Sequence, residues 1–194
     1  YNKTSSKTIF DRTEKGIVSM NYATIKPVDI ANGPGVRVSL FVSGCTHRCK
    51  GCFNEEAWDF QFGKPFTEEV QKQLLSSLDH DYIEGLTLLG GEPMEPSNQE
   101  SLLPFIKAVR EHLPGKTIWC FTGYDFEKDI LGKMMKTSAV TRELIPLFDV
   151  MVDGKFVAEK KNLSLKFRGS ENQRVLNVKK SLEEGRGVWM EEFR

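Results

Sequence analysis

The chain has 194 residues, and its 27 Lys and Arg residues are balanced by 27 Asp and Glu residues. With a net charge of zero, the protein lacks the excess of basic residues that is typical of general nucleic-acid-binding proteins. No apolar run approaches the roughly 18 residues that are needed to span a bilayer. At roughly 150 residues per domain, the length allows one globular domain with a short appendage. Four cysteines are too few for a disulfide scaffold, and three of them lie within eight positions, which indicates a metal or cluster site. We therefore expect a cytoplasmic protein that binds neither nucleic acid nor membranes.

Residues 1–19 are rich in Lys, Thr and Ser and carry no convincing apolar period. The first Met of the chain is Met20, which directly precedes the first persuasive structural signals. We therefore interpret residues 1–19 as a leader foreign to the natural protein, with a natural flexible extension as the alternative. Residues 20–194 are expected to form a single domain.

From Met20 onward strands and helices alternate, which is typical of parallel sheets and barrels. The first predicted strand, 36–42, is β-branched and aromatic and is bounded by glycines. Thr67 is expected to cap a helix with one apolar stripe, and residues 97–100 resemble the capping box of a second helix, which Pro104 delays or bends. The other predicted strands are short and apolar, and they span residues 86–89, 117–121, 148–152 and 174–178.

The size of the folded part limits the architecture. After the first 19 of 194 residues, 175 remain, which is enough for five or six βαβ units of roughly 30 residues each. A closed eight-unit barrel typically needs about 250 residues. We therefore expect a partial barrel or an open sheet.

The strongest chemical signal follows the first predicted strand, where Cys45, Cys49 and Cys52 form a C-x3-C-x2-C pattern. Three thiolates from one loop can converge on a single inorganic centre, and soft thiolates select zinc, Cu(I) or iron-sulfur clusters. A structural zinc site closes with four ligands and usually draws a second pair from a separate segment, which the sequence lacks. We expect His47 to point outward, and we expect Cys120 to pack as a small apolar residue within its strand.

Three thiolates without a fourth protein ligand favour a four-iron, four-sulfur cluster that leaves one iron open for a further ligand. On spacing alone, two alternatives stay open. One is a zinc site, and the other is a redox or packing role for the three thiols.

Each predicted strand leads into a short polar segment. The cysteines follow the first strand, and Gly90-Gly91-Glu92-Pro93 follows the second. Thr122-Gly123-Tyr124 and Asp153-Gly154-Lys155 follow the next two. Because active sites of parallel βα folds lie at the carboxyl ends of the strands, we expect these segments to meet at one rim. The simpler interpretations are a tight turn at the glycine pair and a solvated ion pair between Asp153 and Lys155.

With these motifs the chain resembles the radical S-adenosylmethionine superfamily, whose cluster motif is C-x3-C-x2-C. Within it, the chain is most similar to the small activating proteins of glycyl-radical enzymes, in particular those of anaerobic ribonucleotide reductases. Besides the cysteine loop, the resemblance rests on Asn32-Gly33-Pro34-Gly35-Val36-Arg37, on Gly90-Gly91-Glu92-Pro93 and on residues 168–174, and it covers nearly all of residues 20–194. One departure is Gly51, since the superfamily commonly has an aromatic residue before the third cysteine, whereas here Phe53 follows that cysteine.

The resemblance implies an α/β fold of the partial, laterally open (β/α)6-type barrel kind. It implies that Cys45, Cys49 and Cys52 hold one 4Fe-4S cluster and are the catalytic residues, and that S-adenosyl-L-methionine is the second cofactor. The residues that it implies for binding S-adenosylmethionine are Gly51, Cys52, Phe53, Gly90, Gly91, Glu92, Thr122, Asp153 and Lys155.

The implied activity begins with an external low-potential electron donor such as flavodoxin or ferredoxin. Reductive cleavage of S-adenosylmethionine gives a 5'-deoxyadenosyl radical, which generates a glycyl radical in the C-terminal glycyl loop of the anaerobic (class III) ribonucleotide reductase. Arg168 and Arg174 are candidates for docking that loop. The alternatives are an activase of another glycyl-radical enzyme, a radical enzyme acting on a free metabolite, and a zinc-stabilised interaction module.

Overall fold

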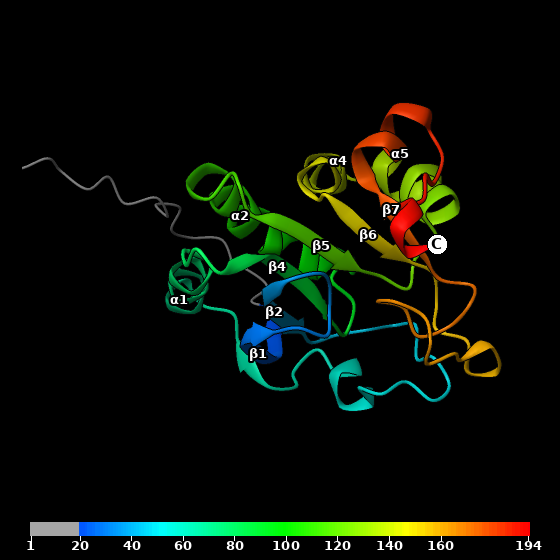
Figure 1. The fold of residues 1–194 in the computed structure, drawn as a ribbon. Helices are drawn as coiled ribbons and strands as arrows, with labels where there is room; N and C mark the ends of the chain where they lie inside the picture. The colour runs from blue at the N-terminus through cyan, green and yellow to red at the C-terminus, as the bar shows by residue number, and fades with distance from the viewer. Residues whose placement is uncertain (1–19) are drawn as a thin grey trace, which may run out of the picture.

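The computed structural model describes residues 20–194, so the interpretation of residues 1–19 lies outside the described residues (Figure 1). The strands are β1 (Asn21–Asp29), β2 (Val36–Val42), β3 (Lys64–Pro65), β4 (Ile83–Gly90), β5 (Thr117–Phe121), β6 (Val150–Asp153) and β7 (Arg174–Asn177). They form one sheet in the order β3-β1-β2-β4-β5-β6-β7. The predicted α/β class is confirmed, and the sheet is open because its edge strands, β3 and β7, do not pair with each other.

The centre of the sheet is parallel and its edges are antiparallel. Strands β2, β4, β5 and β6 are parallel neighbours, whereas β1 pairs antiparallel with both β2 and β3, and β7 pairs antiparallel with β6. Four strands are therefore parallel, fewer than a six-unit arrangement contains. The last predicted strand departs from the parallel expectation because the chain runs back alongside β6.

The helices are α1 (Glu68–Leu78), α2 (Pro96–His112), α3 (Met135–Thr137), α4 (Ala139–Leu144) and α5 (Val178–Glu184), with a π-helical segment η2 (Phe126–Met134). Short 3-10 turns are η1 (Glu55–Trp58), η3 (Ile145–Leu147), η4 (Ala158–Lys160) and η5 (Glu191–Phe193). In residues 20–194 no helix has the length and apolar character that crossing a membrane requires.

The predicted helix starts are confirmed in one case and shifted in the other. Thr67 caps α1, and its Oγ1 accepts a hydrogen bond from the Val70 N–H at 3.4 Å. Helix α2 begins at Pro96, earlier than the capping-box pattern predicts, because a proline at the first helical position has no N–H to satisfy. Pro104 lies inside α2 without ending it.

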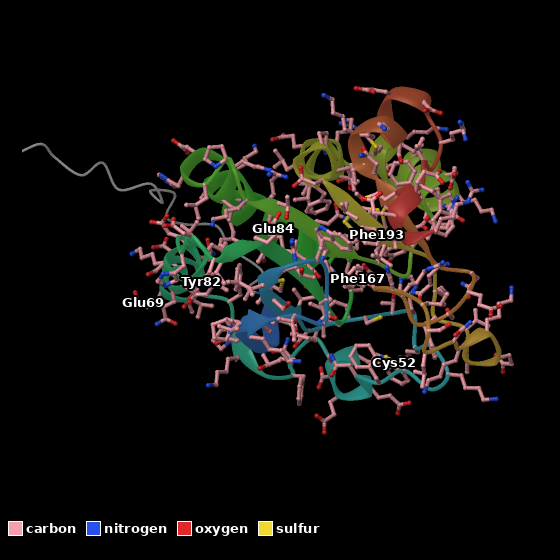
Figure 2. The ribbon with its side chains drawn as sticks, in the orientation of Figure 1. Cys52, Glu69, Tyr82, Glu84, Phe167 and Phe193 are labelled. Atoms are coloured by element: carbon pink, nitrogen blue, oxygen red, sulfur yellow. The ribbon has the colours of Figure 1, made fainter. Side chains whose placement is uncertain are left out.

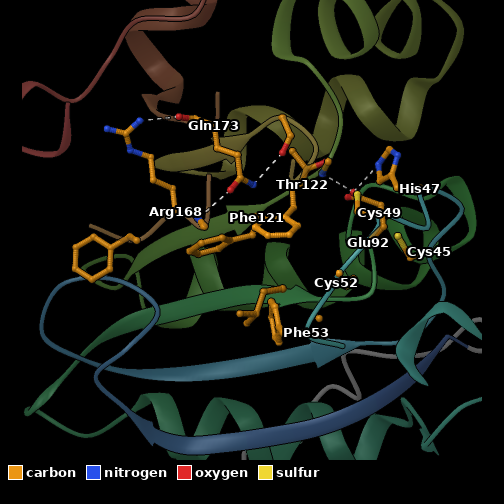
Figure 3. Close-up of a pocket in the computed structure, with 18 of the residues that line it drawn as sticks. Cys45, His47, Cys49, Cys52, Phe53, Glu92, Phe121, Thr122, Arg168 and Gln173 are labelled. Atoms are coloured by element: carbon orange, nitrogen blue, oxygen red, sulfur yellow. Dashed lines mark hydrogen bonds and ion pairs between the residues drawn. The ribbon is translucent and has the colours of Figure 1, made fainter. Parts of the chain in front are cut away.

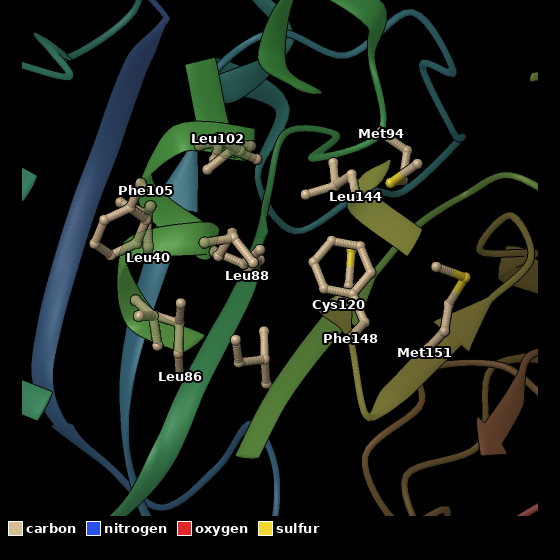
Figure 4. Packing of buried hydrophobic residues seen from close by; sticks show 14 of the residues in the cluster. Leu40, Leu86, Leu88, Met94, Leu102, Phe105, Cys120, Leu144, Phe148 and Met151 are labelled. Atoms are coloured by element: carbon tan, nitrogen blue, oxygen red, sulfur yellow. The ribbon is translucent and has the colours of Figure 1, made fainter. Parts of the chain in front are cut away.

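The main core lies between the sheet and the helices. Alternate residues of β2, namely Val38, Leu40 and Val42, pack with apolar residues of α1, α2 and α4 in one buried cluster (Figure 4). Cys120 on β5 is fully buried in the same cluster, so its prediction as a packing residue is confirmed.

A second, aromatic cluster is built from the other face of the strands. Trp119 packs there with Val152, and its ring lies edge-on to Phe167 at 5.4 Å and to Phe193 at 5.6 Å between ring centroids. Phe167 and Phe193 lie close to each other in Figure 2. Phe193 belongs to the C-terminal turn η5, so the end of the chain is fixed to this face. The cluster supports one side of the cavity described next.

Candidate functional site

A cavity of about 470 Å³ lies where β2, β4, β5 and β6 end (Figure 3). This volume is within the range of small-molecule and cofactor sites. All four polar segments that follow these strands contribute to its lining, so the expectation that they meet at one rim is confirmed. The expected site residues that line it are Cys45, Cys49, Gly51, Cys52, Phe53, Gly90, Gly91, Glu92 and Thr122.

The three clustered thiols are free, and backbone amides lie at each of them. Amides of the loop itself reach Cys45, and the amide of Phe156, from the segment after β6, reaches Cys49. The Asn54 N–H donates to the Cys52 Sγ at 3.4 Å. Hydrogen bonds to sulfur are one of the ways in which a protein tunes an iron-sulfur centre.

Two of the three thiols, those of Cys45 and Cys49, have a raised pKa. Burial raises the pKa of Cys45 to about 11, and the carboxylates of Glu92 and Glu95 add to this effect. Burial likewise raises the pKa of Cys49. Metal binding at these residues therefore releases protons and is pH-dependent.

The separation of the thiols distinguishes a single ion from a larger centre. Within residues 20–194, Asp125, Glu127 and Asp153 are the one group of at least three potential ligand side chains whose ligand atoms lie within 4.8 Å of one another. The three thiols are therefore more widely spread. Thiolates on one tetrahedral zinc ion lie about 3.8 Å apart, because Zn–S bonds are about 2.3 Å long. This spread is compatible with the larger span of a multi-metal centre.

The glycine pair after β4 lets this strand end pack against the start of the cysteine loop. Gly90 has a φ of +106°, and a Cβ on Gly91 would lie 2.6 Å from the carbonyl oxygen of Gly44. The same carbonyl accepts a hydrogen bond from the Glu92 N–H at 2.8 Å. Gly44 directly precedes the first cysteine, so the glycines position the thiols as well as lining the cavity.

Glu92 is almost fully buried, and its carboxylate joins three segments. Its Oε1 accepts a hydrogen bond from the Met94 N–H at 2.8 Å, and its Oε2 accepts one from the Gly123 N–H at 2.7 Å. The same Oε2 lies 2.9 Å from His47 Nε2 (Figure 3). The His47 ring packs edge-on against Tyr124. The prediction that His47 points outward was wrong, because this carboxylate holds the ring inside.

Asp153 and Lys155 are the two expected cofactor residues that the structure does not bring to the cavity lining. Asp153 Oδ1 accepts a hydrogen bond from Arg174 Nε at 3.0 Å, and Asp153 Oδ2 accepts one from the Phe126 N–H at 2.9 Å. Arg174, not Lys155, is therefore the cationic partner of Asp153. Arg174 also pairs with Glu127 at 2.6 Å and holds the pKa of Glu127 at about 2. Because its guanidinium is engaged in these pairs, Arg174 is poorly placed to dock a partner.

Several lining residues had not been identified in the sequence. The segment that begins at Lys161 covers one side, and Leu163 at its tip is 90% exposed. Phe121 and Phe167 form an apolar part of the wall. Gln173, from the 168–174 segment singled out in the sequence, also lines the cavity, and its Nε2 donates to the Gly154 carbonyl at 2.9 Å. The position of Phe121 at the end of a predicted strand was an available signal. For the irregular segment around Leu163 there was none.

Comparison with known proteins agrees with this geometry. A family model described as "4Fe-4S single cluster domain" matches residues 31–176. A protein of Pasteurella multocida named anaerobic ribonucleoside-triphosphate reductase-activating protein is 45% identical over 156 residues, covering 79% of this chain and 95% of the relative. Its namesake in Escherichia coli K12 is 41% identical over 162 residues, covering 82% of this chain and all of the relative.

The chain belongs to this family of activating proteins. A further member, from Enterobacteria phage T4, is 45% identical over 158 residues and is covered over 93% of its length. A single 4Fe-4S cluster is accordingly the metal centre of the domain. The family's match begins before the cysteine loop and ends within β7, so it includes all four segments that line the cavity.

Proposed function

We propose that the protein activates an anaerobic ribonucleoside-triphosphate reductase by generating a glycyl radical on it. The observation that carries this proposal is the meeting of three free thiols with the ends of four parallel strands around one cofactor-sized cavity. Relatives with 41% and 45% identity over nearly their whole length are named as activating proteins of that reductase, which supports the choice of partner.

Cys45, Cys49 and Cys52 are the proposed cluster ligands, and three thiolates would leave a position of the cluster open for S-adenosylmethionine. When bound, the cluster and S-adenosylmethionine would supply the radical chemistry: with one electron from an external donor, S-adenosylmethionine would be cleaved to methionine and a 5'-deoxyadenosyl radical, which would take a hydrogen atom from a glycine of the partner. The side chains of this protein need to bind, orient and exclude water, and none has to act as a general acid or base.

The cavity wall offers complementary groups for S-adenosylmethionine. The buried carboxylate of Glu92 provides negative charge for the α-amino group, since an ammonium requires acceptors. Thr122, Gly51 and Phe53 also line the cavity, and we assign Thr122 to the ribose and Gly51 with Phe53 to the adenine. Phe53 is 84% exposed, which leaves its ring free to cover a bound base. The cavity lining supports no such contact for Asp153 and Lys155.

Two features support a protein substrate and an external electron donor: the exposed side chains at the cavity and the small number of cysteines. The large exposed side chains of Phe53 and Leu163 at its mouth are unusual for a site closed over a small metabolite. Cys120 is the one cysteine of this sequence outside the cluster loop, and it is buried in the core, so the sequence offers no set of cysteines for a second cluster. We infer a low-potential donor such as flavodoxin or ferredoxin. We also infer that residues 20–194 are one domain whose open sheet corresponds to the superfamily's partial barrel.

The test is the formation of 5'-deoxyadenosine by anaerobically reconstituted protein given S-adenosylmethionine and dithionite. Cys49→Ser is expected to abolish the product and lower the iron content, whereas Cys120→Ala, which alters the only thiol outside the loop, is expected to retain both. Product formation by Cys49→Ser at the normal rate would contradict the proposed ligand set. Zinc in place of iron in the active wild-type protein would contradict the proposed reaction.

A further inference from the structure

Glu95 is a buried carboxylate that contacts the cysteine loop from outside the cavity lining. Its side chain lies just before helix α2 and is 5% exposed. Oε1 accepts two hydrogen bonds from Thr46, one from the backbone N–H at 2.8 Å and one from the hydroxyl at 2.5 Å. Thr46 directly follows Cys45, so this carboxylate fixes the chain next to the first proposed cluster ligand.

The charge of Glu95 has no cationic partner among residues 20–194. Glu92, the other buried carboxylate of this region, lies against His47, and Asp153 is paired with Arg174. No ion pair joins Glu95 to any Lys, Arg or His of the described chain, and its hydrogen-bond donors both belong to neutral Thr46. A buried carboxylate without a counter-ion is costly for folding, which points to a use for the charge other than stability.

The field of this carboxylate extends to the cysteine loop. Its Oε1 lies 2.8 Å from the amide nitrogen of Thr46, which is bonded directly to Cys45, so the charge lies close to the first proposed cluster ligand. It also adds to the burial that raises the pKa of Tyr124 to about 12. Because the side chain is buried, salt and water screen this field less than they screen a surface charge.

Negative charge beside an iron-sulfur cluster favours its oxidised form. One-electron reduction makes the cluster more negative by one charge, so a nearby carboxylate destabilises the reduced form more than the oxidised form. Net charge, hydrogen bonds to sulfur and solvent exposure are the factors that set such potentials. A neutral residue at this position would therefore leave the cluster easier to reduce.

We propose that Glu95 is a positioning and tuning residue that holds the cluster potential more negative, while its bonds to Thr46 fix the loop at Cys45. The proposal rests on the proposed function, in that it takes Cys45, Cys49 and Cys52 to hold the cluster. A more negative potential makes the reduced cluster a stronger donor towards a sulfonium. It also restricts the external donor to one of comparably low potential.

The test is the reduction potential of the reconstituted protein, measured by redox titration monitored by electron paramagnetic resonance, with and without S-adenosylmethionine. Glu95→Gln removes the charge and keeps an acceptor for Thr46. We expect it to shift the potential to a less negative value with unchanged iron content and no loss of folding stability. Glu100→Gln, an exposed position on α2, is the matched control and is expected to keep the wild-type potential.

Thr46→Val separates charge from anchoring, because it removes the hydroxyl donor and leaves the carboxylate in place. It is expected not to reproduce the shift of Glu95→Gln. A potential in Glu95→Gln equal to that of the wild type, or an equal shift in Thr46→Val, would overturn the tuning role while leaving the proposed function intact. Failure of the wild-type protein to assemble a cluster would overturn both.

Discussion

Substitution of Gly91 by Ala tests whether the glycine pair positions the cysteine loop. A Cβ at Gly91 would lie 2.6 Å from the Gly44 carbonyl oxygen and 2.9 Å from that of Ala57, and both obstacles are backbone atoms. To reach the 3.4 Å of an ordinary contact, the two chain segments must separate by about 0.8 Å, which also stretches the hydrogen bond from the Glu92 N–H to Gly44. Overpacking of this kind costs about 1–3 kcal/mol.

We therefore expect Gly91→Ala to lower the melting temperature by roughly 2–12 °C, at about 2–4 °C per kcal/mol for a chain of this size. It should also lower iron incorporation, because Gly44 precedes Cys45. Gly115→Ala is the control, since a Cβ there meets nothing within 4 Å. Calorimetry and iron analysis measure both effects. Wild-type stability and iron content in Gly91→Ala would refute the role assigned to this contact.

Three further predictions concern the rest of the molecule. Arg174→Met should lower the free energy of unfolding by about 3–5 kcal/mol in urea titrations, because it leaves a buried carboxylate unpaired. In the wild type, the pairing of Glu127 with Arg174 contributes to folding stability fully above about pH 4.5, and this contribution is lost as the pH falls towards about 2. The stability of Arg174→Met should therefore depend less on pH in this range. Cys120→Ala should keep the full iron content by chemical analysis. Phe193→Ala should lower the free energy of unfolding by roughly 1–3 kcal/mol in calorimetry, because two ring contacts are lost. It should also weaken the binding of S-adenosylmethionine, measured by titration, because Phe193 packs against Phe167, which lines the cavity.

The fold was predictable where the signal is local. The strands β2 and β5 span the residues expected from their apolar runs, and α1 begins after the expected cap at Thr67. Strand β1 escaped prediction because its side chains are mostly exposed or half-buried and show no clear alternation. The antiparallel direction of β7 depends on how the preceding segment returns to the sheet, and the short apolar sequence of β7 carries no signal for this direction.

The site was predictable as a meeting of segments but not in the direction of individual side chains. Parallel strands bring their carboxyl ends to one edge, so the convergence of the cysteines with Glu92 and Thr122 follows from the order of the elements. The inward turn of His47 depends on a partner 45 residues away, and the engagement of Asp153 depends on one 21 residues away. Such distant partners leave no trace in the local pattern.

The most direct test of the proposed function is to mix the reconstituted protein with S-adenosylmethionine, dithionite and an anaerobic ribonucleoside-triphosphate reductase under strict exclusion of oxygen. Electron paramagnetic resonance then detects the radical on the reductase, and chromatography measures 5'-deoxyadenosine in the same sample. We predict a glycyl radical signal that accompanies 5'-deoxyadenosine and is absent with Cys49→Ser. An iron-loaded wild-type protein that yields neither the radical nor the nucleoside in the presence of the reductase would contradict the proposal.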